Sequence, residues 1–454
     1  MPYCGFDRSE RKKMNLPEKY AQRMKKLLGE QYDDYVRSLD EPPVRAIKVN
    51  TTKISVDDFI RYSGLEVDRC GFAEDCLILR GRQKIGKTPF HHGGAAYVQE
   101  PGAMLPVIAA DIQKTDVVLD LCAAPGGKTV QAASRAAEVV ANEVDAKRVK
   151  TLVGNVVRMG LKNVAVTNAF PDRLKEDFSE YFDVVVADVP CSGEGMMRKE
   201  EQAVLAWSEE NVLGCDARQR EILISADKML KKGGKLVYST CTFAPEENEM
   251  QVAFLVKELG YELLEPSGEV LAYSTKGVET DGLNAEYMRR VYPHHGVGEG
   301  QFFAVLKKSG CDCASERTKN RKTEKTGRIK QADEFFKQYA KVTPPCFTMG
   351  NAVIMPTVKL PGFLPYAVTR GVKLGEIIGN RFVPAHDCFL ALWNEFSLRV
   401  EVDETAAEKY LRGEEIECDQ KGWCVVTYKG VPLGGGKASG GVLKNHYPKG
   451  LRNV

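Results

Sequence analysis

Several features that would assign a chain to a specialised class of protein are missing from this sequence. Its 454 residues contain no apolar run long enough to cross a membrane. Its start, MPYCGFDRSERKKMNLPEKY, has no apolar segment of the kind found in secretory signals. We therefore expect a cytoplasmic protein with no membrane partner. The net charge is only +2, so an argument for a nucleic-acid partner must come from local charge.

Metal-binding patterns are also missing. The 13 cysteines are scattered and include no CxxC pair, so the sequence predicts no zinc site and we expect no metal. Cys311 and Cys313 are the nearest pair, and they lie in a polar stretch. In a reducing cytoplasm the cysteines should remain thiols.

Length and composition predict a soluble globular protein of two or three domains. Residues 1–94 combine helical periodicity with short strands, which indicates a small α+β domain. Residues 95–308 alternate apolar, β-branched runs with helical stretches, which predicts a Rossmann-like, doubly wound α/β domain around a parallel sheet. Residues 309–332 are polar and typical of a flexible linker. Residues 333–454 begin with a helix and then become strand-rich.

The expected strands are short apolar runs at regular intervals. In the first domain they are residues 45–53 and 76–81, and the stretch from Leu16 to Leu39 is expected to be helical. In the α/β domain they are residues 117–121, 138–142, 163–167, 183–188, 235–240 and 302–306.

A glycine turn joins the first of these α/β strands to a helix, in VVLDLCAAPGGKTVQAAS. Pro125-Gly126-Gly127 allows the backbone to approach a ligand closely, and a helix starting near Lys128 offers free N–H groups to a phosphate or a carboxylate. The turn matches neither GxxxxGK[ST] nor GxGxxG. Glu143 follows the second strand, where an acid suits ribose hydroxyls. The pattern fits S-adenosylmethionine or a dinucleotide, and equally a structural turn with a surface glutamate.

Two cysteines follow two consecutive strands, in DVPCSGEG and LVYSTC. Consecutive strands of a doubly wound sheet usually lie side by side, about 4.8 Å apart. Ligands of such sheets bind beyond the carboxyl ends of the strands. Cys191 and Cys241 are therefore expected at the ligand edge, facing one small substrate. The alternative is that both are ordinary buried cysteines.

Methyl transfer to carbon 5 of cytosine would use two thiols. Attack by a thiolate on carbon 6 makes carbon 5 nucleophilic, and this is covalent catalysis. A base must then remove the carbon 5 proton so that the thiol can leave. Asp188 is placed to bind the exocyclic amine or the protonated N3 of the ring.

Four stretches carry a resemblance to a known family: YVQEPGAM (97–104), DLCAAPGGKT (120–129), DVPCSGEG (188–195) and STCTFAPEENE (239–249). Over residues 16–308 the chain resembles the NOL1/NOP2/Sun family of RNA cytosine-5 methyltransferases. The resemblance implies Cys241 as nucleophile, Cys191 as the thiol that assists release, and Asp188 as a third catalytic residue. It implies S-adenosylmethionine as cofactor, bound by Cys122, Ala123, Ala124, Pro125, Gly126, Gly127, Lys128, Glu143, Arg148 and Asp188.

One position departs from the family. An acid usually follows the third strand, near the adenine, but here VTNAFPDRL places Phe170 there. Asn168 or Asp172 could take its role, and we favour Asn168.

The C-terminal stretch GGGKASGGVLKNHYPKGLRNV is basic, has an aromatic residue and contains no acid. Positive charge beside an aromatic ring suits phosphates and a stacked base, although basic tails also serve solubility. The RNA-binding residues expected here are Lys437, Lys444, His446, Tyr447, Lys449 and Arg452. This segment and residues 360–387 resemble the PUA-like, RNA-binding domain of the bacterial RsmF subgroup. A second basic run, from Arg8 to Lys26, is interpreted equally well as an RNA contact or a solvated helix face.

The resemblance implies a methyltransferase acting on 16S rRNA near the decoding region, with the rRNA or the small ribosomal subunit as partner. Transfer RNA is the alternative substrate. A non-catalytic RNA-binding ribosome-assembly factor is the alternative from another class. We expect a monomer, and we interpret His294 and His295 as structural or substrate-lining.

Overall fold

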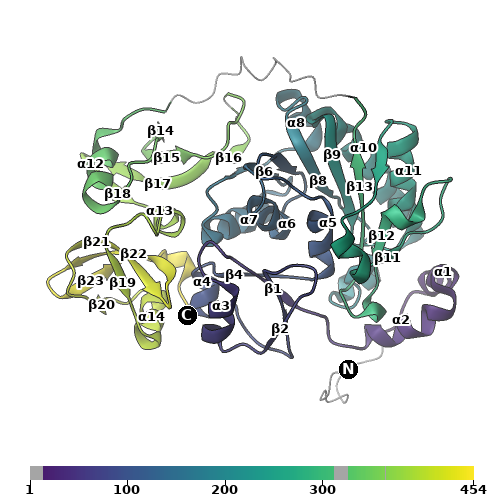
Figure 1. Cartoon of the computed structure of the whole chain (residues 1–454), viewed down its shortest axis with the longest axis horizontal. Coiled ribbons are helices and arrows are strands. Elements are labelled where there is room, and N and C mark those ends of the chain that lie inside the picture. The colour runs from purple at the N-terminus through teal and green to yellow at the C-terminus, as the bar shows by residue number, and fades with distance from the viewer. Residues whose placement is uncertain (1–13, 311–325, 363, 454) are drawn as a thin grey trace.

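The computed structural model of the chain describes residues 14–310, 326–362 and 364–453 (Figure 1). Most of the expected linker, together with Cys311 and Cys313, lies outside these residues. Among the described helices, none combines the length and the apolar character needed to cross a membrane.

The N-terminal unit is an α+β structure, as predicted. Its helices are α1 (Glu18–Leu28), α2 (Tyr32–Leu39), α3 (Val56–Ser63) and α4 (Pro89–His92). Its strands are β1 (Ala46–Val49), β2 (Val67–Arg69), β3 (Cys76–Leu79) and β4 (Ala96–Gln99), in the order β2-β3-β1-β4. β4 lies beyond the expected boundary at residue 94 and pairs antiparallel with β1.

A ten-stranded sheet forms the centre of the molecule, in the order β11-β12-β13-β9-β8-β5-β6-β7-β16, with β10 beside β13. Its strands from the α/β region are β5 (Val117–Asp120), β6 (Glu138–Asn142), β7 (Val164–Thr167), β8 (Phe182–Asp188), β9 (Leu230–Thr240), β10 (Glu262–Leu264), β11 (Thr275–Lys276), β12 (Met288–Val291) and β13 (Gln301–Lys307). The five from β5 to β9 run parallel. All six strands expected here are present, which confirms the Rossmann-like fold.

Helices cover both faces of this sheet, because its central strands are apolar on both sides. They are α5 (Leu105–Ala109), α6 (Gly127–Ala133), α7 (Ala146–Met159), α8 (Pro171–Asp177), α9 (Glu201–Ala206), α10 (Glu209–Met229) and α11 (Glu249–Lys257). Figure 1 shows α10 and α11 to the right of β8 and β9, and α6 and α7 to their left. Neighbouring residues of β8 alternate between the two cores: Val185 packs on the first side, and Val184 and Val186 on the second.

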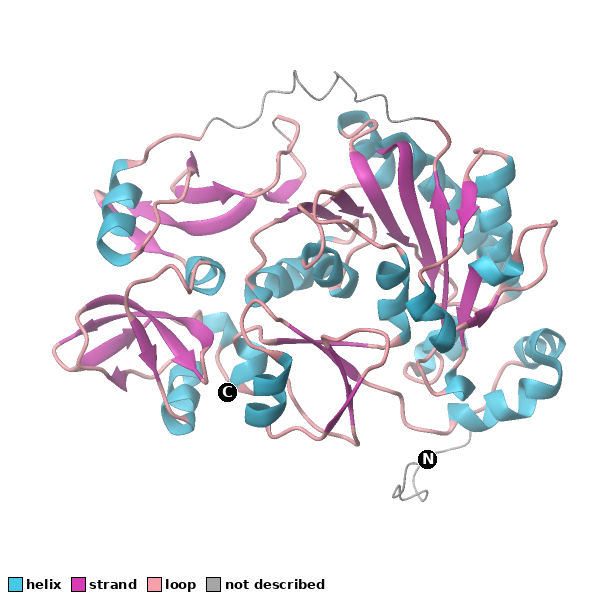
Figure 2. Ribbon diagram, viewed as in Figure 1, coloured by secondary structure: helices cyan, strands magenta, loops and turns pink. Residues whose placement is uncertain are grey.

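The C-terminal region is strand-rich, as predicted, and contains two sheets (Figure 2). The first holds β14 (Phe347–Met349), β15 (Ala352–Pro356), β17 (Gly371–Ile378) and β18 (Arg381–Pro384). The second holds β19 (Arg399–Glu401), β20 (Ile416–Glu417), β21 (Gly422–Tyr428), β22 (Val431–Ser439) and β23 (Val442–Asn445). The helices are α12 (Lys330–Tyr339), α13 (His386–Ala391) and α14 (Glu404–Arg412). Thus α12 begins inside the span expected to be linker.

One C-terminal strand leaves its own region. β16 (Ala367–Thr369) pairs antiparallel with β7 and so extends the central sheet. Val358, Leu360 and Leu364, which precede it, are buried in the core under α8 and α10. The exposed backbone of the edge strand β7 and the apolar surface beside it explain this docking.

Candidate active site

The two thiols meet at the carboxyl ends of neighbouring strands. β8 and β9 lie side by side, with Asp188 opposite Ser239. Cys191 and Cys241, just beyond these strand ends, bring their Sγ atoms to 3.2 Å. Both cysteines are free and half-buried. A bonded pair would be about 2.05 Å apart, so the structure holds two facing thiols at the ligand edge.

Hydrogen bonding and burial both act on the Cys191 thiol. The pKa of Cys191 is raised well above the ordinary value, chiefly by its hydrogen bond with Cys241 and then by burial. Cys191 therefore stays protonated and can donate its S–H to the sulfur of Cys241.

Asp188 ends β8 and is fixed by three neighbours. Its Oδ1 accepts from Ser239 Oγ at 2.7 Å and from Gln301 Nε2 at 3.3 Å. Its Oδ2 lies 2.9 Å from Lys128 Nζ, whose side chain is buried. The Asp188 side chain keeps about a third of its surface exposed, so the carboxylate is oriented and still accessible to a ligand.

The glycine turn lies between the ends of β5 and β6. Gly126 has a φ of 114°, a conformation that strongly favours glycine, and α6 begins at the next residue. Ala123 N donates to Asn142 O at 2.8 Å, and Asn155 Nδ2 donates to Pro125 O at 2.9 Å. Arg148 donates to Ala124 O. These bonds fix the turn, and the first N–H groups of α6 have no partner within the helix.

Glu143 fits the expected ribose contact. It is buried, and its Oε1 accepts from Asp145 N at 3.0 Å. Its Oε2 lies 3.2 Å from Arg148 Nη1 but has no hydrogen-bond partner in the described structure. Because this buried oxygen has an ion-pair partner but no hydrogen bond, it can accept one from a ligand hydroxyl at the end of β6. The acid, the turn and the helix start together fit S-adenosylmethionine.

Asp120 at the end of β5 is buried, and Cys122 in the turn is half-buried. Burial raises the pKa of the half-buried Cys122 thiol. Asp120, which the sequence interpretation passed over, is buried and bonds Thr129 Oγ1 at 2.6 Å, while its Oδ1 has no hydrogen-bond partner in the described structure. Burial raises the pKa of Asp120 to about 7.

Asn168 sits beside the Glu143 loop. Its Nδ2 donates to Glu143 O at 2.7 Å and to Val144 O at 2.9 Å, which leaves Oδ1 to accept from an adenine amine. Phe170 is 72% exposed. Asp172 is exposed as well and pairs with Lys175 within α8. Asn168 thus contacts the Glu143 loop, whereas Asp172 does not, and the role of Asn168 on the adenine side stays a prediction.

The C-terminal residues expected to contact RNA divide into two groups. Lys437, Lys444, His446 and Lys449 are exposed on or after β22 and β23. Tyr447 is only 3% exposed, and its hydroxyl hydrogen-bonds His92 Nδ1 at 2.7 Å. The expectation that Tyr447 stacks on a base is wrong, because its ring packs in the core shared with the N-terminal unit.

Arg452 and His446 are both partly packed against the rest of the protein. Arg452 is half-buried, and its Nε has no hydrogen-bond partner in the described structure. The ring of His446 packs against Trp423, with ring centroids 4.5 Å apart.

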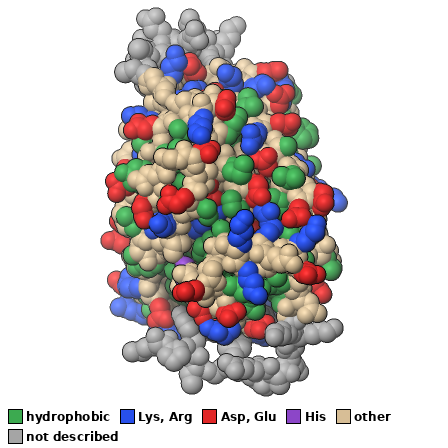
Figure 3. Space-filling view, turned by 90° about the vertical axis from the view of Figure 1, so that its right-hand side faces the viewer, with side chains coloured by type: hydrophobic (Ala, Val, Ile, Leu, Met, Phe, Trp, Pro, Cys, Tyr) green, Lys and Arg blue, Asp and Glu red, His purple; other side chains and the backbone are tan. Residues whose placement is uncertain are grey.

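The described part of the N-terminal basic run is partly neutralised. Lys19 pairs with Glu209 at 2.9 Å, and Arg23 pairs with Glu246 at 2.7 Å. The residues before Met14 lie outside the described residues. Figure 3 shows acidic and basic side chains intermingled on the face at the right of Figure 1. The face therefore presents no field of one sign over the residues drawn in colour.

His294 and His295 agree with a structural role. His294 lies against Tyr35 and Tyr292, and its Nε2 is 3.1 Å from Gln31 Oε1. Burial lowers the pKa of His294 to about 4, so it stays neutral near pH 7. Among the described residues, no group of three or more His, Cys, Asp or Glu side chains could hold a metal.

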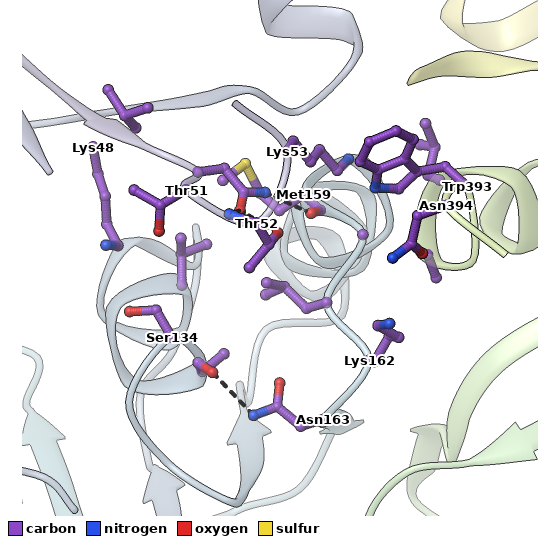
Figure 4. A pocket seen from close by; sticks show the side chains of 18 residues that line it. Lys48, Thr51, Thr52, Lys53, Ser134, Met159, Lys162, Asn163, Trp393 and Asn394 are labelled. Atoms are coloured by element: carbon purple, nitrogen blue, oxygen red, sulfur yellow. Dashed lines mark hydrogen bonds between the residues drawn. The ribbon is translucent and has the colours of Figure 1, made fainter. Parts of the chain in front are cut away.

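A cavity of about 310 Å³ lies where the three regions meet (Figure 4). It is lined by the turn after β1, the ends of α6 and α7, and Trp393 after α13. Lys53, on this turn, donates to Gly93 O at 2.8 Å and to Arg158 O at 3.0 Å, and Lys48 pairs with Asp75. Lys162 also lines the cavity, but because the ammonium groups of Lys48 and Lys53 are engaged by the protein, we interpret the cavity as a packing gap between the three regions.

Sequence reasoning missed a buried polar cluster beside the thiols. Glu247 is fully buried and contacts Ser192 and Gln219. Gln301, which bonds Asp188, was missed as well. The only signal was the acid-rich PEENE stretch soon after Cys241, and spacing alone cannot distinguish its buried acids from exposed ones.

Comparisons with known families match three parts of the chain. The 16S rRNA methyltransferase RsmB/F family matches residues 107–307. The N-terminal domain of the 16S rRNA methyltransferase RsmF matches residues 16–101, and the methyltransferase RsmF PUA domain matches residues 397–453. The last match covers the second of the two C-terminal sheets.

Similar whole proteins agree with these matches. The chain is 33% identical to ribosomal RNA small subunit methyltransferase F of Klebsiella pneumoniae (strain 342), over 92% of each chain. It is 32% identical to the protein of that name from Enterobacter sp. (strain 638), over 96% of this chain and 95% of the relative.

Solved structures resemble about two thirds of the chain. A methyltransferase homolog protein from Pyrococcus horikoshii is 29% identical, with a TM-score of 0.56 over 64% of this chain and 95% of the homolog. NSun6 from Pyrococcus horikoshii with SFG shares the fold at 22% identity, with a TM-score of 0.57 over 65% of this chain and 99% of NSun6.

Proposed function

Because this chain belongs to the RsmF family of 16S rRNA methyltransferases, we propose that it methylates carbon 5 of a cytosine in 16S rRNA through a covalent bond to Cys241. Membership makes it an S-adenosylmethionine-dependent methyltransferase with an RNA-binding PUA domain at residues 397–453. The cytosine atom, the covalent bond and the roles of single residues are the proposal.

The observation that carries the proposal is the 3.2 Å contact between the Sγ atoms of Cys191 and Cys241. Methyl transfer to an oxygen or an amine needs no thiol nucleophile. Carbon 5 of cytosine does need one, because it becomes nucleophilic only after addition at carbon 6. Two thiols at one ligand edge match a reaction in which one adds to the base and the other assists its release.

Cys241 and Asp188 have separate roles in the proposed addition to the base. The Cys241 thiolate adds to carbon 6, and the carbon 5–carbon 6 π pair moves toward carbon 5 and N3. Asp188 accepts a hydrogen bond from the exocyclic amine or the protonated N3 and so stabilises the charge that develops on the ring. Bound S-adenosylmethionine supplies an electrophilic methyl group.

Release reverses the addition. A base removes the carbon 5 proton, the electron pair restores the carbon 5–carbon 6 double bond, and the bond from carbon 6 to Cys241 breaks. Cys191, held as a thiol, donates a hydrogen bond to the departing sulfur. Cys241 is therefore proposed as the nucleophile and Cys191 as the release residue.

The same groups bear on the non-catalytic alternative. A scaffold that only bound RNA would not need an open acceptor on Glu143, an oriented Asp188 and two facing thiols. The enzymatic function therefore accounts for more of the site. For the substrate, the matched families favour 16S rRNA over transfer RNA.

Methylation of unmodified RNA tests the proposal. The protein is incubated with labelled S-adenosylmethionine and, in turn, small-subunit rRNA, small subunits and tRNA, and any 5-methylcytosine is mapped by bisulfite sequencing. We expect label at a 16S rRNA cytosine with the wild type and none with Cys241→Ala. Cys191→Ala should accumulate a covalent protein–RNA adduct that resists denaturing gels.

Three outcomes would contradict parts of this account. Label in tRNA alone would retain the chemistry and change the substrate. An adduct with Cys241→Ala but not with Cys191→Ala would exchange the two thiol roles. Tight RNA binding without label in any substrate would support the assembly-factor alternative.

A further inference from the structure

Glu247 is a buried acid beside the thiols that the mechanism above does not use. It ends a short 3-10 turn, Pro245–Glu247, and its side chain is fully buried. Its Oε2 accepts from Ser192 N at 3.0 Å and from Gln219 Nε2 at 2.8 Å, and its Oε1 accepts from Ser192 Oγ at 2.5 Å. A buried carboxylate with three donors is a strong constraint on its neighbours.

These bonds join the two loops that carry the thiols. Ser192 directly follows Cys191, and its Oγ is 2.7 Å from Thr242 Oγ1, which directly follows Cys241. Gln219 Nε2, from α10, also donates to Pro190 O at 3.0 Å. The carboxylate of Glu247 thus fixes the residue next to each sulfur, directly on one side and through Ser192 on the other.

The charge of Glu247 also acts on the Cys191 thiol. It is a smaller cause of the raised pKa of Cys191, after the Cys241 hydrogen bond, burial and the charge of Cys241. Burial raises the pKa of Glu247 itself to about 7, against the lowering effect of its hydrogen bonds. The other titratable groups that interact with it are Glu194, Cys215 and Tyr238, so the described surroundings supply hydrogen bonds rather than a cation.

We propose that Glu247 is a positioning residue for release: its carboxylate aligns the Cys191 and Cys241 loops through Ser192, so that the Cys191 thiol stays directed at the departing Cys241 sulfur. The role rests on the proposed function. It assigns no new chemical step, because Glu247 acts through its bonds to Ser192 and Gln219. The alignment of the two thiols then depends on the Glu247 carboxylate, which bonds the residue that follows Cys191.

Glu247→Gln tests the proposal, because it removes the charge and keeps the shape. Glu246→Gln is a matched control, since Glu246 is the neighbouring acid and pairs with Arg23 instead. Alkylation of Cys191 by iodoacetamide is followed against pH by peptide mass spectrometry, without RNA or cofactor. In parallel, the lifetime of the covalent adduct is measured in single-turnover reactions with 16S rRNA.

We expect the apparent pKa of Cys191 in Glu247→Gln to fall by about one unit, through loss of a nearby like charge. Adduct formation should stay near the wild-type rate, while release slows about tenfold. Glu246→Gln should match the wild type in both assays. If Glu247→Gln strongly lowers the melting temperature, Ser192→Ala is the second variant, because it removes only the hydroxyl that links Glu247 to Thr242. Ser192→Ala should also slow release, by a smaller factor.

An unchanged Cys191 titration together with an unchanged adduct lifetime would overturn the proposal. So would equal slowing of adduct formation and release, which would indicate a general loss of structure. Failure of the proposed function looks different: the wild type would form no adduct, whereas the alkylation assay would still report whether Glu247 controls Cys191.

Discussion

At the scale of single residues, Glu143 tests how the cofactor is held. Its buried Oε2 is an open acceptor, so Glu143→Gln replaces a charged acceptor of a ribose hydroxyl by a weaker or mismatched group. We expect the dissociation constant for S-adenosylmethionine to rise about tenfold, which is about 1.4 kcal/mol. Isothermal titration calorimetry measures it.

Asp172→Asn is the control for this prediction. Asp172 is exposed and paired only with Lys175 in the described structure, so its substitution should leave cofactor affinity unchanged. A loss of affinity with Asp172→Asn would instead make Asp172, and not Asn168, the residue on the adenine side. No loss with Glu143→Gln would remove Glu143 from the cofactor site.

At the scale of elements, β16 fastens the C-terminal region to the central sheet. Thr369 Oγ1 accepts from Val166 N at 3.0 Å, and Tyr366 O accepts from Asn168 N at 2.9 Å. The docked strand covers the edge of β7, which would otherwise present unpaired backbone groups. It also holds Asn168, next to the proposed adenine side of the cofactor.

Thr369→Val should expose the energetic role of this contact. The variant keeps the side-chain shape but leaves the Val166 N–H without its partner, which should lower the free energy of unfolding by about 1–3 kcal/mol. Hydrogen exchange should show faster exchange at Val166. Thr348→Val, on the exposed face of β14, should change stability by less than about 0.5 kcal/mol. Equal effects of the two variants on stability would show that the Thr369–Val166 hydrogen bond does not stabilise the docked strand.

At the scale of the whole molecule, the three regions share cores. One cluster of buried side chains joins Ile47 and Phe90 of the N-terminal unit to Tyr410, Val426 and Leu443 of the C-terminal region. Figures 1 and 2 show the second C-terminal sheet beside α3 and α4 of the N-terminal unit. Removing residues 333–454 would therefore expose two cores, so point substitutions test RNA binding better than truncation.

The exposed lysines of the second sheet provide that test. Replacing Lys437, Lys444 and Lys449 with glutamine should weaken 16S rRNA binding and reduce the slope of log affinity against log salt by about 0.7–0.9 for each phosphate that the variant no longer neutralises. Lys257→Gln is the control, because Lys257, on α11, pairs with Asp281. Filter binding at several salt concentrations measures the slope. An unchanged slope would exclude these lysines from the RNA-binding surface.

Unlike these exposed lysines, Tyr447 of the same segment is buried. The sequence pattern around it was interpreted as an aromatic base platform, because basic residues surround a tyrosine. The side chain turns inward instead, toward His92, Tyr410 and His386. Local composition cannot reveal this, since the neighbours of Tyr447 come from segments far apart in the chain.

The sequence alone determined six strands of the central sheet, the glycine turn and the thiol pair, because these depend on local patterns. Apolar runs specify strands, and consecutive parallel strands bring Cys191 and Cys241 to one edge. Only the tertiary structure decided that β16 docks on β7, that Tyr447 is buried and that Glu247 joins the thiol loops. Each of these depends on contacts between distant segments, and burial, rather than residue type, sets the chemistry of such groups.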